Sequence, residues 1–124
     1  MFEVGVVAQF EAAHRLRGDF GPATRLHGHT YRVEIALRGP SLQEDGTLYD
    51  IGRLQEAVQQ VVSALHYRDL DEHEGLAGKN TTAEVVAHYL WTEIAPRIRS
   101  GGVTAVTVRL WESPQAYAAY EEDL

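Results

Sequence analysis

The sequence predicts an α+β fold in which two helices cover one face of a four-stranded antiparallel sheet. Apolar and polar residues alternate near both ends of the chain, whereas apolar residues recur at steps of three and four in its middle. A period of two is typical of half-buried strands, and a period of 3.6 is typical of amphipathic helices. The predicted order is strand, strand, helix, helix, strand, strand. Segregation of strands from helices is typical of α+β domains.

The first two predicted strands flank a loop. Alternation runs from Phe2 to Ala13 and returns from His29 to Leu37. Gly18, Gly21 and Pro22 lie between these segments and indicate a loop. Because residues i and i+2 of a strand point to the same face, each segment has one apolar face. We expect the two strands to pair antiparallel.

Two helices are predicted in the middle of the chain. Asp50 can cap a helix that runs from Ile51 to Leu65, where apolar residues form one stripe. Thr81 and Glu84 have the spacing of a capping box, and the helix that follows runs to about Ile94. A proline two residues later ends it. The polar segment between the helices predicts a connection without regular structure.

The last part of the chain predicts two more strands. The glycines of residues 100–103 indicate a turn. Val106, Val108 and Leu110 then alternate with their neighbours, which predicts a third strand, and residues 115–122 predict a short fourth. A sheet this small has exposed edges, which often pair with another subunit.

Composition restricts the classes of function. The chain has 124 residues, enough for one domain over 1–124, and 44% of them are hydrophobic. With no cysteine, a transition metal must be held by histidine or carboxylates, and a net charge of −7 argues against general binding to nucleic acid or membranes. We see neither a signal peptide nor an apolar run long enough to cross a bilayer, so we expect a cytoplasmic protein. A local group of arginines can still meet an anionic ligand: Arg15, Arg17, Arg25 and Arg32.

Three histidines are predicted to meet at the open end of the first hairpin. His27 and His29 are two residues apart and share the parity of the second strand's apolar face, while His14 extends the apolar face of the first strand. Three neutral imidazoles suit Zn²⁺ with one coordination position left open. A lone histidine or a lone His-x-His pair is more often structural. The other three histidines are spread out, and we expect them on the surface or in the core.

Several segments resemble the 6-pyruvoyltetrahydropterin synthase family, which includes the 6-carboxytetrahydropterin synthases. The histidine segments FEAAHRL (10–16) and RLHGHTY (25–31) carry much of the resemblance. GTLYDIGRL (46–54), NTTAEVVAHYLW (80–91) and VRLWES (108–113) extend it over nearly the whole chain.

The resemblance implies a T-fold whose trimers close a β-barrel and stack into a homohexamer. It implies zinc on His14, His27 and His29, and a substrate, 7,8-dihydroneopterin triphosphate, from which triphosphate is eliminated. Glu112 falls on the family's pterin-anchoring glutamate, whose carboxylate can accept two hydrogen bonds from a pterin edge. Thr82 would add a polar contact to the pterin. Glu84 is interpreted as a helix cap rather than a contact.

The sequence departs from the family at its proton-transfer positions. The usual general base is a cysteine where this chain has Ala23, and the usual Asp-His pair is replaced by His66 and Tyr67. General acid–base catalysis contributes roughly 10²–10⁴-fold to rates, so the usual reaction should be suppressed. His66 or Tyr67 is a candidate substitute acid or base. A shifted pair formed by Asp71 and His73 is another.

Three functions remain open at this point. The first is a zinc-dependent pterin lyase with altered acid–base residues, and the second is a T-fold protein that binds a pterin or purine-like ring without turnover. The third is a small metallohydrolase, which would need a carboxylate base beside the metal. Glu11 has the wrong strand parity for that role, so this function ranks last.

Overall fold

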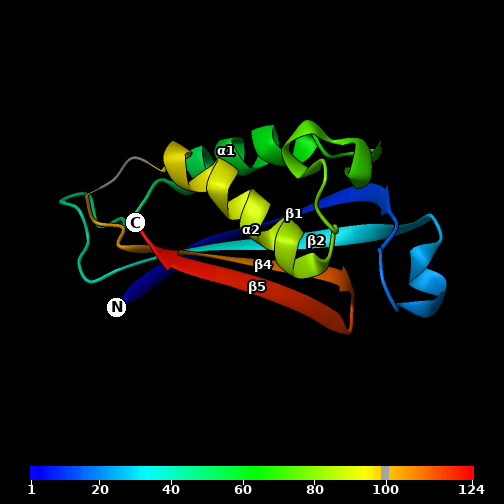
Figure 1. The fold of residues 1–124 in the computed structure, drawn as a ribbon. Helices are drawn as coiled ribbons and strands as arrows, with labels where there is room; N and C mark the ends of the chain where they lie inside the picture. Colours follow the sequence, from blue (N-terminus) through cyan, green and yellow to red (C-terminus); the bar gives the residue numbers. More distant parts are fainter. Residues whose placement is uncertain (99–100) are drawn as a thin grey trace.

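The computed structural model describes residues 1–98 and 101–124. One layer is a twisted sheet, and two helices cover one of its faces (Figure 1). The sheet order is β3-β1-β2-β4-β5. The main elements are β1 (Phe2–His14), β2 (His27–Gly39), α1 (Ile51–Ser63), β3 (Arg68–Asp69), α2 (Ala83–Ile94), β4 (Ala105–Ser113) and β5 (Ala116–Asp123). The predicted α+β class and both helices are confirmed.

The antiparallel hairpin of β1 and β2 is longer than predicted. Its register runs from the pair Phe2 and Gly39 to the pair His14 and His27, so both strands extend to the histidines. β4 and β5 continue the sheet antiparallel, and β5 has the predicted length but begins and ends one residue later than predicted. The turn predicted at 100–103 begins at residue 100, which lies outside the described residues.

The prediction of four strands is wrong, because the sheet has a fifth, short strand, β3. β3 pairs parallel with β1, so that Arg68 lies opposite Ala12 and Asp69 opposite Ala13. The main-chain N–H of Tyr67 donates to the carbonyl of Glu11 at 2.6 Å and begins this attachment. A strand of two residues is too short to show any period, and therefore the sequence pattern gave no sign of it.

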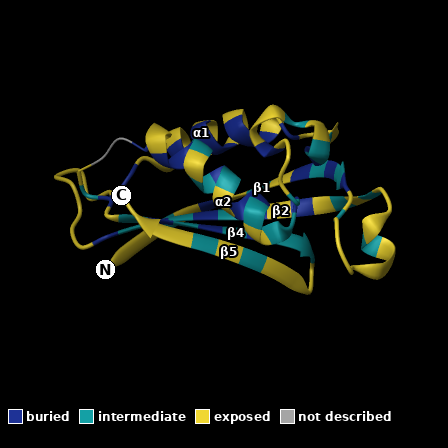
Figure 2. Ribbon diagram, in the orientation of Figure 1, coloured by how far each residue is buried: buried dark blue, intermediate teal, exposed yellow. Residues whose placement is uncertain are grey.

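The core lies between the sheet and the helices, as the patterning predicts. Phe10 and Tyr31, on neighbouring strands, stack with ring centroids 4.9 Å apart. Burial alternates along β1, β2 and β4, and the inner sides of both helices are buried (Figure 2). The opposite sheet face carries ion pairs, such as those of Glu34 with Arg32 and Arg109. No helix among residues 1–98 and 101–124 is long and apolar enough to cross a membrane.

The two helix caps differ from each other in how well they were predicted. Asp50 caps α1 as expected, and its carboxylate accepts the N–H of Gly52 at 2.8 Å. α1 ends at Ser63, two residues before the predicted end. The cap of α2 is Thr82 rather than Thr81, because the Thr82 hydroxyl accepts the N–H of Val85 at 3.2 Å.

The predicted capping box is therefore absent from α2. Thr81 is fully buried, and its hydroxyl donates to Asp71 at 2.8 Å instead of accepting a helix N–H. Glu84 lies exposed in the first turn, one residue short of the position from which it would reach back to the cap.

Replacing Asp50 by alanine should destabilise the protein. Asp50→Ala leaves the first N–H groups of α1 without their carboxylate acceptor, which typically lowers the free energy of unfolding by about 1 kcal/mol. Urea unfolding at one fixed protein concentration measures this change. Asp50→Asn keeps an oxygen acceptor and is the matched control. Equal stability of the alanine and asparagine variants would contradict the capping role.

Candidate metal centre

The end of β1 and the start of β2 bring three histidines together. His14 and His27 are direct partners in the strand register, and His29 lies opposite Ala12. One ring nitrogen from each histidine lies within 4.8 Å of the others. The ring centroids are 4.6, 5.1 and 4.9 Å apart for His14–His27, His14–His29 and His27–His29. This histidine cluster lies at the end of the sheet away from both chain termini (Figure 1).

Main-chain carbonyl groups orient two of the three rings. Nδ1 of His14 donates to the main-chain carbonyl oxygen of Thr81 at 2.8 Å, and Nδ1 of His27 donates to that of Arg25 at 2.7 Å. A carbonyl oxygen only accepts, so Nδ1 carries the hydrogen in both rings and Nε2 keeps a free lone pair. The imidazole of His29 lies near Glu112. Hydrogen bonds to carbonyl oxygens orient histidine ligands in metal sites.

The donor set fits a tetrahedral metal ion. Nε2 of His14 and Nε2 of His29 are 3.2 Å apart. Two ligands about 2.05 Å from one tetrahedral zinc ion would be separated by about 3.3 Å. His14 is buried and the other two rings are half-buried, so the cluster opens to one side. Three nitrogen ligands with an open side are typical of a metal site that admits an exogenous ligand.

The surroundings of His29 favour its neutral form. Burial lowers the pKa of His29, the negative charge of Glu112 opposes this shift, and the rings of His14 and His27 lower the pKa further. The net shift is downward from 6.5. A neutral imidazole is the form that binds a metal, so His29 is poised to act as a ligand at neutral pH.

Both residues predicted to bind a pterin lie beside the cluster. Glu112 falls at an irregularity of the β4–β5 ladder between Trp111 and Ser113, and it lies near enough for its negative charge to act on His29. An irregularity of this kind re-aims a side chain relative to the regular strand. Thr82 directly follows the residue that accepts the His14 hydrogen. Its hydroxyl accepts the N–H of Val85 and so retains its own hydrogen for donation.

Two further residues behind His14 were missed by sequence reasoning as parts of the site. The hydroxyl of Tyr31 lies 3.4 Å from Nδ1 of His14, and the hydroxyl of Thr81 lies 3.3 Å from it. Burial raises the pKa of Tyr31, and the charges of Glu112 and Asp71 raise it further. Tyr31 therefore stays a neutral hydroxyl and is not a ground-state base. The parity of Tyr31 with His29 was the only sequence signal for this placement.

The residues at the altered proton-transfer positions lie outside the cluster's hydrogen bonds. Ala23 lies in a short 3-10 helix, and its carbonyl accepts the N–H of Leu16 at 2.8 Å. Nδ1 of His66 accepts the main-chain N–H of Glu11 at 3.0 Å. Tyr67 is 80% exposed and has a φ of 58°. Within residues 1–98 and 101–124, neither His66 nor Tyr67 contacts a ring of the cluster.

The alternative pair of Asp71 and His73 does not form. Nε2 of His73 lies 2.8 Å from the hydroxyl of Tyr89. Asp71 instead accepts the hydroxyl of Thr81 and the main-chain N–H of Arg15, each at 2.8 Å. Among residues 1–98 and 101–124, Asp71 and His73 therefore each have a different partner and do not form a hydrogen-bonded pair.

Glu11 is also placed away from the cluster, as its parity predicts. It lies on the sheet face opposite the helices, where its carboxylate accepts the hydroxyl of Thr30. It cannot act as a carboxylate base beside the histidines. Glu11 therefore does not supply the carboxylate base that a metallohydrolase would need.

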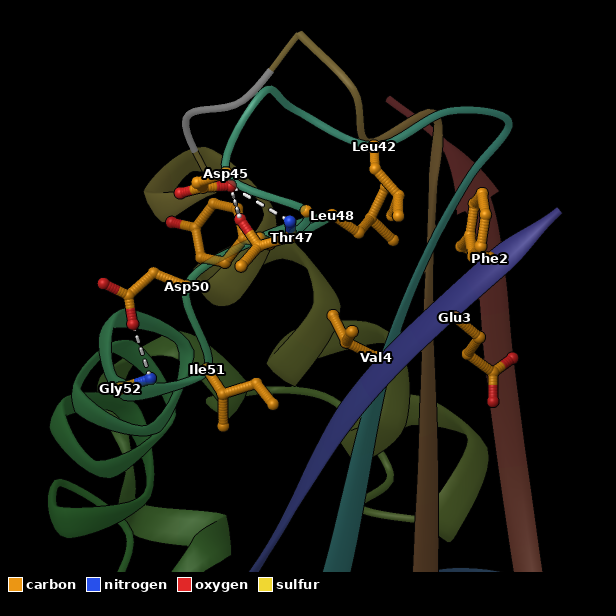
Figure 3. Close-up of a pocket in the computed structure, with 12 residues that line it drawn as sticks. Phe2, Glu3, Val4, Leu42, Asp45, Thr47, Leu48, Asp50, Ile51 and Gly52 are labelled. Atoms are coloured by element: carbon orange, nitrogen blue, oxygen red, sulfur yellow. Dashed lines mark hydrogen bonds between the residues drawn. The ribbon is translucent and has the colours of Figure 1, made fainter.

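A separate hollow of about 680 Å³ lies where β1 begins, at the other end of the sheet (Figure 3). Phe2, Val4 and Leu42 form part of its apolar wall. Its two aspartates already have local roles, because Asp45 accepts from Thr47 and Asp50 caps α1. None of the predicted site residues lines this hollow. The histidine cluster is the better candidate site, since it combines convergent donors with a shifted pKa.

Comparison with known proteins agrees with this fold. A model of the 6-pyruvoyl tetrahydropterin synthase family matches residues 3–123. The 6-pyruvoyl tetrahydrobiopterin synthase of Drosophila melanogaster is 30% identical over 125 aligned residues, covering 90% of this chain and 74% of that protein. The 6-carboxy-5,6,7,8-tetrahydropterin synthase of Haemophilus influenzae is 27% identical over 145, covering 98% and 100%.

A solved structure gives the same result for the fold. The 6-pyruvoyl tetrahydropterin synthase of Caenorhabditis elegans superposes with a TM-score of 0.85 at 26% identity, covering 98% of this chain and 95% of that one. The match extends over the helices and the whole sheet rather than over the histidine segments alone. This chain therefore belongs to the 6-pyruvoyl tetrahydropterin synthase family and has its T-fold.

Proposed function

We propose that the chain is a zinc-dependent pterin lyase that acts on 7,8-dihydroneopterin triphosphate or a related dihydropterin. The observation that carries this proposal is the cluster of three histidines, two of which have Nε2 freed by carbonyl acceptors. The relatives with 6-pyruvoyl and 6-carboxy tetrahydropterin synthase names support the substrate class. His14, His27 and His29 would hold the metal. Bound there, zinc would act as a Lewis acid on substrate oxygens.

The chain's own residues would hold the ring of the substrate. Glu112 presents a half-buried carboxylate beside His29, which suits the adjacent ring N–H and amine of a pterin. The hydroxyl of Thr82 is a donor near the start of α2. Arg15 and Arg25 are exposed. Arg15 directly follows His14 in the sequence, and Arg25 lies two residues before His27. They are the cations that we assign to the anionic triphosphate.

Proton transfer would depend on residues that differ from the family pattern. Ala23 has no group that can accept a proton. We therefore assign the role to His66 or Tyr67, which project from the edge of the sheet at Glu11. His66 must release the N–H of Glu11 before its Nδ1 can take a proton. This requirement predicts slow turnover.

The second candidate function is pterin or purine binding without turnover. It is favoured by the same observation that Nδ1 of His66 is already occupied. Both functions share a cytoplasmic homohexamer as the proposed assembly, built from two trimers in which β5 of one subunit joins the part of β1 that β3 leaves unpaired in its neighbour. Exposed strand edges favour such pairing.

Removing one histidine should abolish tight zinc binding. His27→Ala leaves two imidazoles, which is one ligand fewer than the set that suits a tetrahedral ion. Zinc content of the dialysed protein, measured by elemental analysis, should fall from one ion per chain towards none. His88→Ala removes an exposed histidine of α2 and is the control. Equal zinc content in the two variants would argue against the cluster as the metal site.

Neutralising Glu112 should weaken pterin binding. Glu112→Gln loses one acceptor oxygen and the negative charge, and a charge-assisted hydrogen bond contributes about 1.5–3 kcal/mol, or roughly 10–150-fold in affinity. Calorimetry with a dihydropterin on the zinc-loaded protein measures the effect. Glu84→Gln, at an exposed position of α2, is the control. Undiminished affinity in Glu112→Gln, with zinc retained, would count against Glu112 as the anchor.

Turnover separates the two candidate functions. Zinc-loaded protein should eliminate triphosphate from 7,8-dihydroneopterin triphosphate, and mass spectrometry should detect the product. Loss of an acid–base group lowers a rate by roughly 10²–10⁴-fold, so His66→Gln or Tyr67→Phe should slow the reaction, whereas His88→Ala should not. Binding of the substrate without any product supports the non-catalytic function. Failure to bind any pterin would rule out both.

A further inference from the structure

Asp71 joins the two chain segments that meet behind His14. One of its carboxylate oxygens accepts the hydroxyl of Thr81, and the other accepts the main-chain N–H of Arg15, each at 2.8 Å. Arg15 directly follows His14 in sequence. Thr81 supplies the carbonyl oxygen that accepts the Nδ1 hydrogen of His14. A single carboxylate therefore holds both the strand end that carries the ring and the residue that orients the ring.

The bond from Thr81 to Asp71 also decides what the Thr81 hydroxyl presents to His14. Oγ1 of Thr81 lies 3.3 Å from Nδ1 of His14. A hydroxyl has one hydrogen, and Asp71 accepts it, so that only lone pairs of Oγ1 face the imidazole. Nδ1 then keeps its own hydrogen, and Nε2 keeps the lone pair that a metal needs. Without Asp71, the Thr81 hydrogen is free to turn towards Nδ1 and favour the opposite tautomer.

The hydrogen bonds around His14 and Thr81 are buried, so water cannot readily replace a partner that is lost. Thr81 is 0% and His14 is 1% exposed, so neither can exchange its partner for water without a cost. Asp71 is itself held in place, because its main-chain N–H donates to the carboxylate of Asp69 at 2.9 Å. The preceding residue, Leu70, is fully buried and fixes this short 3-10 helix (Leu70–Glu72) on the core.

We propose that Asp71 is a positioning residue that sets the orientation and tautomer of His14 through Thr81 and thereby strengthens metal binding. This inference rests on the metal site of the proposed function and adds a residue that touches neither metal nor substrate. Partners of this kind, one step removed from a histidine ligand, change metal affinity by roughly 10–100-fold when they are removed.

The test compares zinc affinity between the parent and the Asp71→Asn variant. Thr81 and Arg15 donate to different oxygens of Asp71, and an amide replaces one of these oxygens by an NH₂ donor, so one of the two bonds is lost. Zinc affinity, measured by competition with a chromophoric chelator on metal-stripped protein, should fall by roughly 10–100-fold. Glu72→Gln removes an exposed carboxylate from the same 3-10 helix and should leave the affinity unchanged.

Variants of Thr81 test the route through its hydroxyl. Thr81→Val keeps the shape and the main-chain carbonyl but removes the bond to Asp71, so it should weaken zinc binding as Asp71→Asn does. Thr81→Ser keeps the hydroxyl and should restore most of the affinity. The double variant should bind zinc no more weakly than the worse single variant, because both changes remove the same bond. If Asp71→Asn fails to fold, the Thr81 variants carry the test.

A spectroscopic readout separates positioning from a general loss of stability. The visible absorption of the Co²⁺-loaded protein reports ligand geometry and should change in Asp71→Asn and Thr81→Val but not in Glu72→Gln. Zinc affinity and a Co²⁺ spectrum equal to those of the parent in folded Asp71→Asn would overturn the inference while leaving the metal site intact. A parent protein that binds no zinc would instead overturn the proposed function, and this inference with it.

Discussion

The pairing register of β1 and β2 is the constraint on which the rest of the site depends. It places His14 directly opposite His27 and leaves His29 on the same face, so that three rings meet without any loop having to position them. A slip by one residue would turn the histidines of one strand to the other face. The stacked pair of Phe10 and Tyr31 opposes such a slip, because it would have to leave the core. The packing that stabilises the sheet therefore also determines the geometry of the candidate metal centre.

The register brings the three rings together, and main-chain carbonyl acceptors determine the tautomers of two of them. Thr81 is 67 positions from His14 in sequence, yet its carbonyl fixes the hydrogen of that ring on Nδ1. Arg25 does the same for His27 from two positions away. A histidine cluster without these acceptors would hold a mixture of tautomers, and only one tautomer of each ring offers Nε2 to a metal. The start of α2 is thus part of the centre, although it contributes no metal ligand.

The sequence predicted the parts of this protein that follow a period and missed those that depend on a single long-range contact. Alternation identified the strands, and the shared parity of His27 and His29 with the apolar face of β2 predicted their meeting with His14. Alternation could not identify β3, because two residues show no period. The capping-box spacing of Thr81 and Glu84 predicted the wrong cap for α2, because the hydroxyl of Thr81 is bound to Asp71 and that of Thr82 accepts the helix N–H instead. The sequence also could not predict the partners of Asp71, because side-chain hydrogen bonds between residues far apart in the sequence leave no local pattern.

The candidate metal ligands and the candidate proton-transfer residues belong to different kinds of structure in this chain. The histidine cluster belongs to paired strands, where each side chain is fixed by the ladder and the core. The altered proton-transfer residues lie in connections: Ala23 in a short 3-10 helix, and His66 and Tyr67 at the edge beside β1. Because Nδ1 of His66 accepts a main-chain N–H, the neutral ring carries its hydrogen on Nε2 and has no free lone pair with which to act as a base. His66 could act as a base only if its hydrogen bond from Glu11 broke, and the main-chain N–H of Glu11 would then need a new acceptor. Changes in such connections can therefore alter the candidate proton-transfer residues while the sheet still holds the three histidines in place.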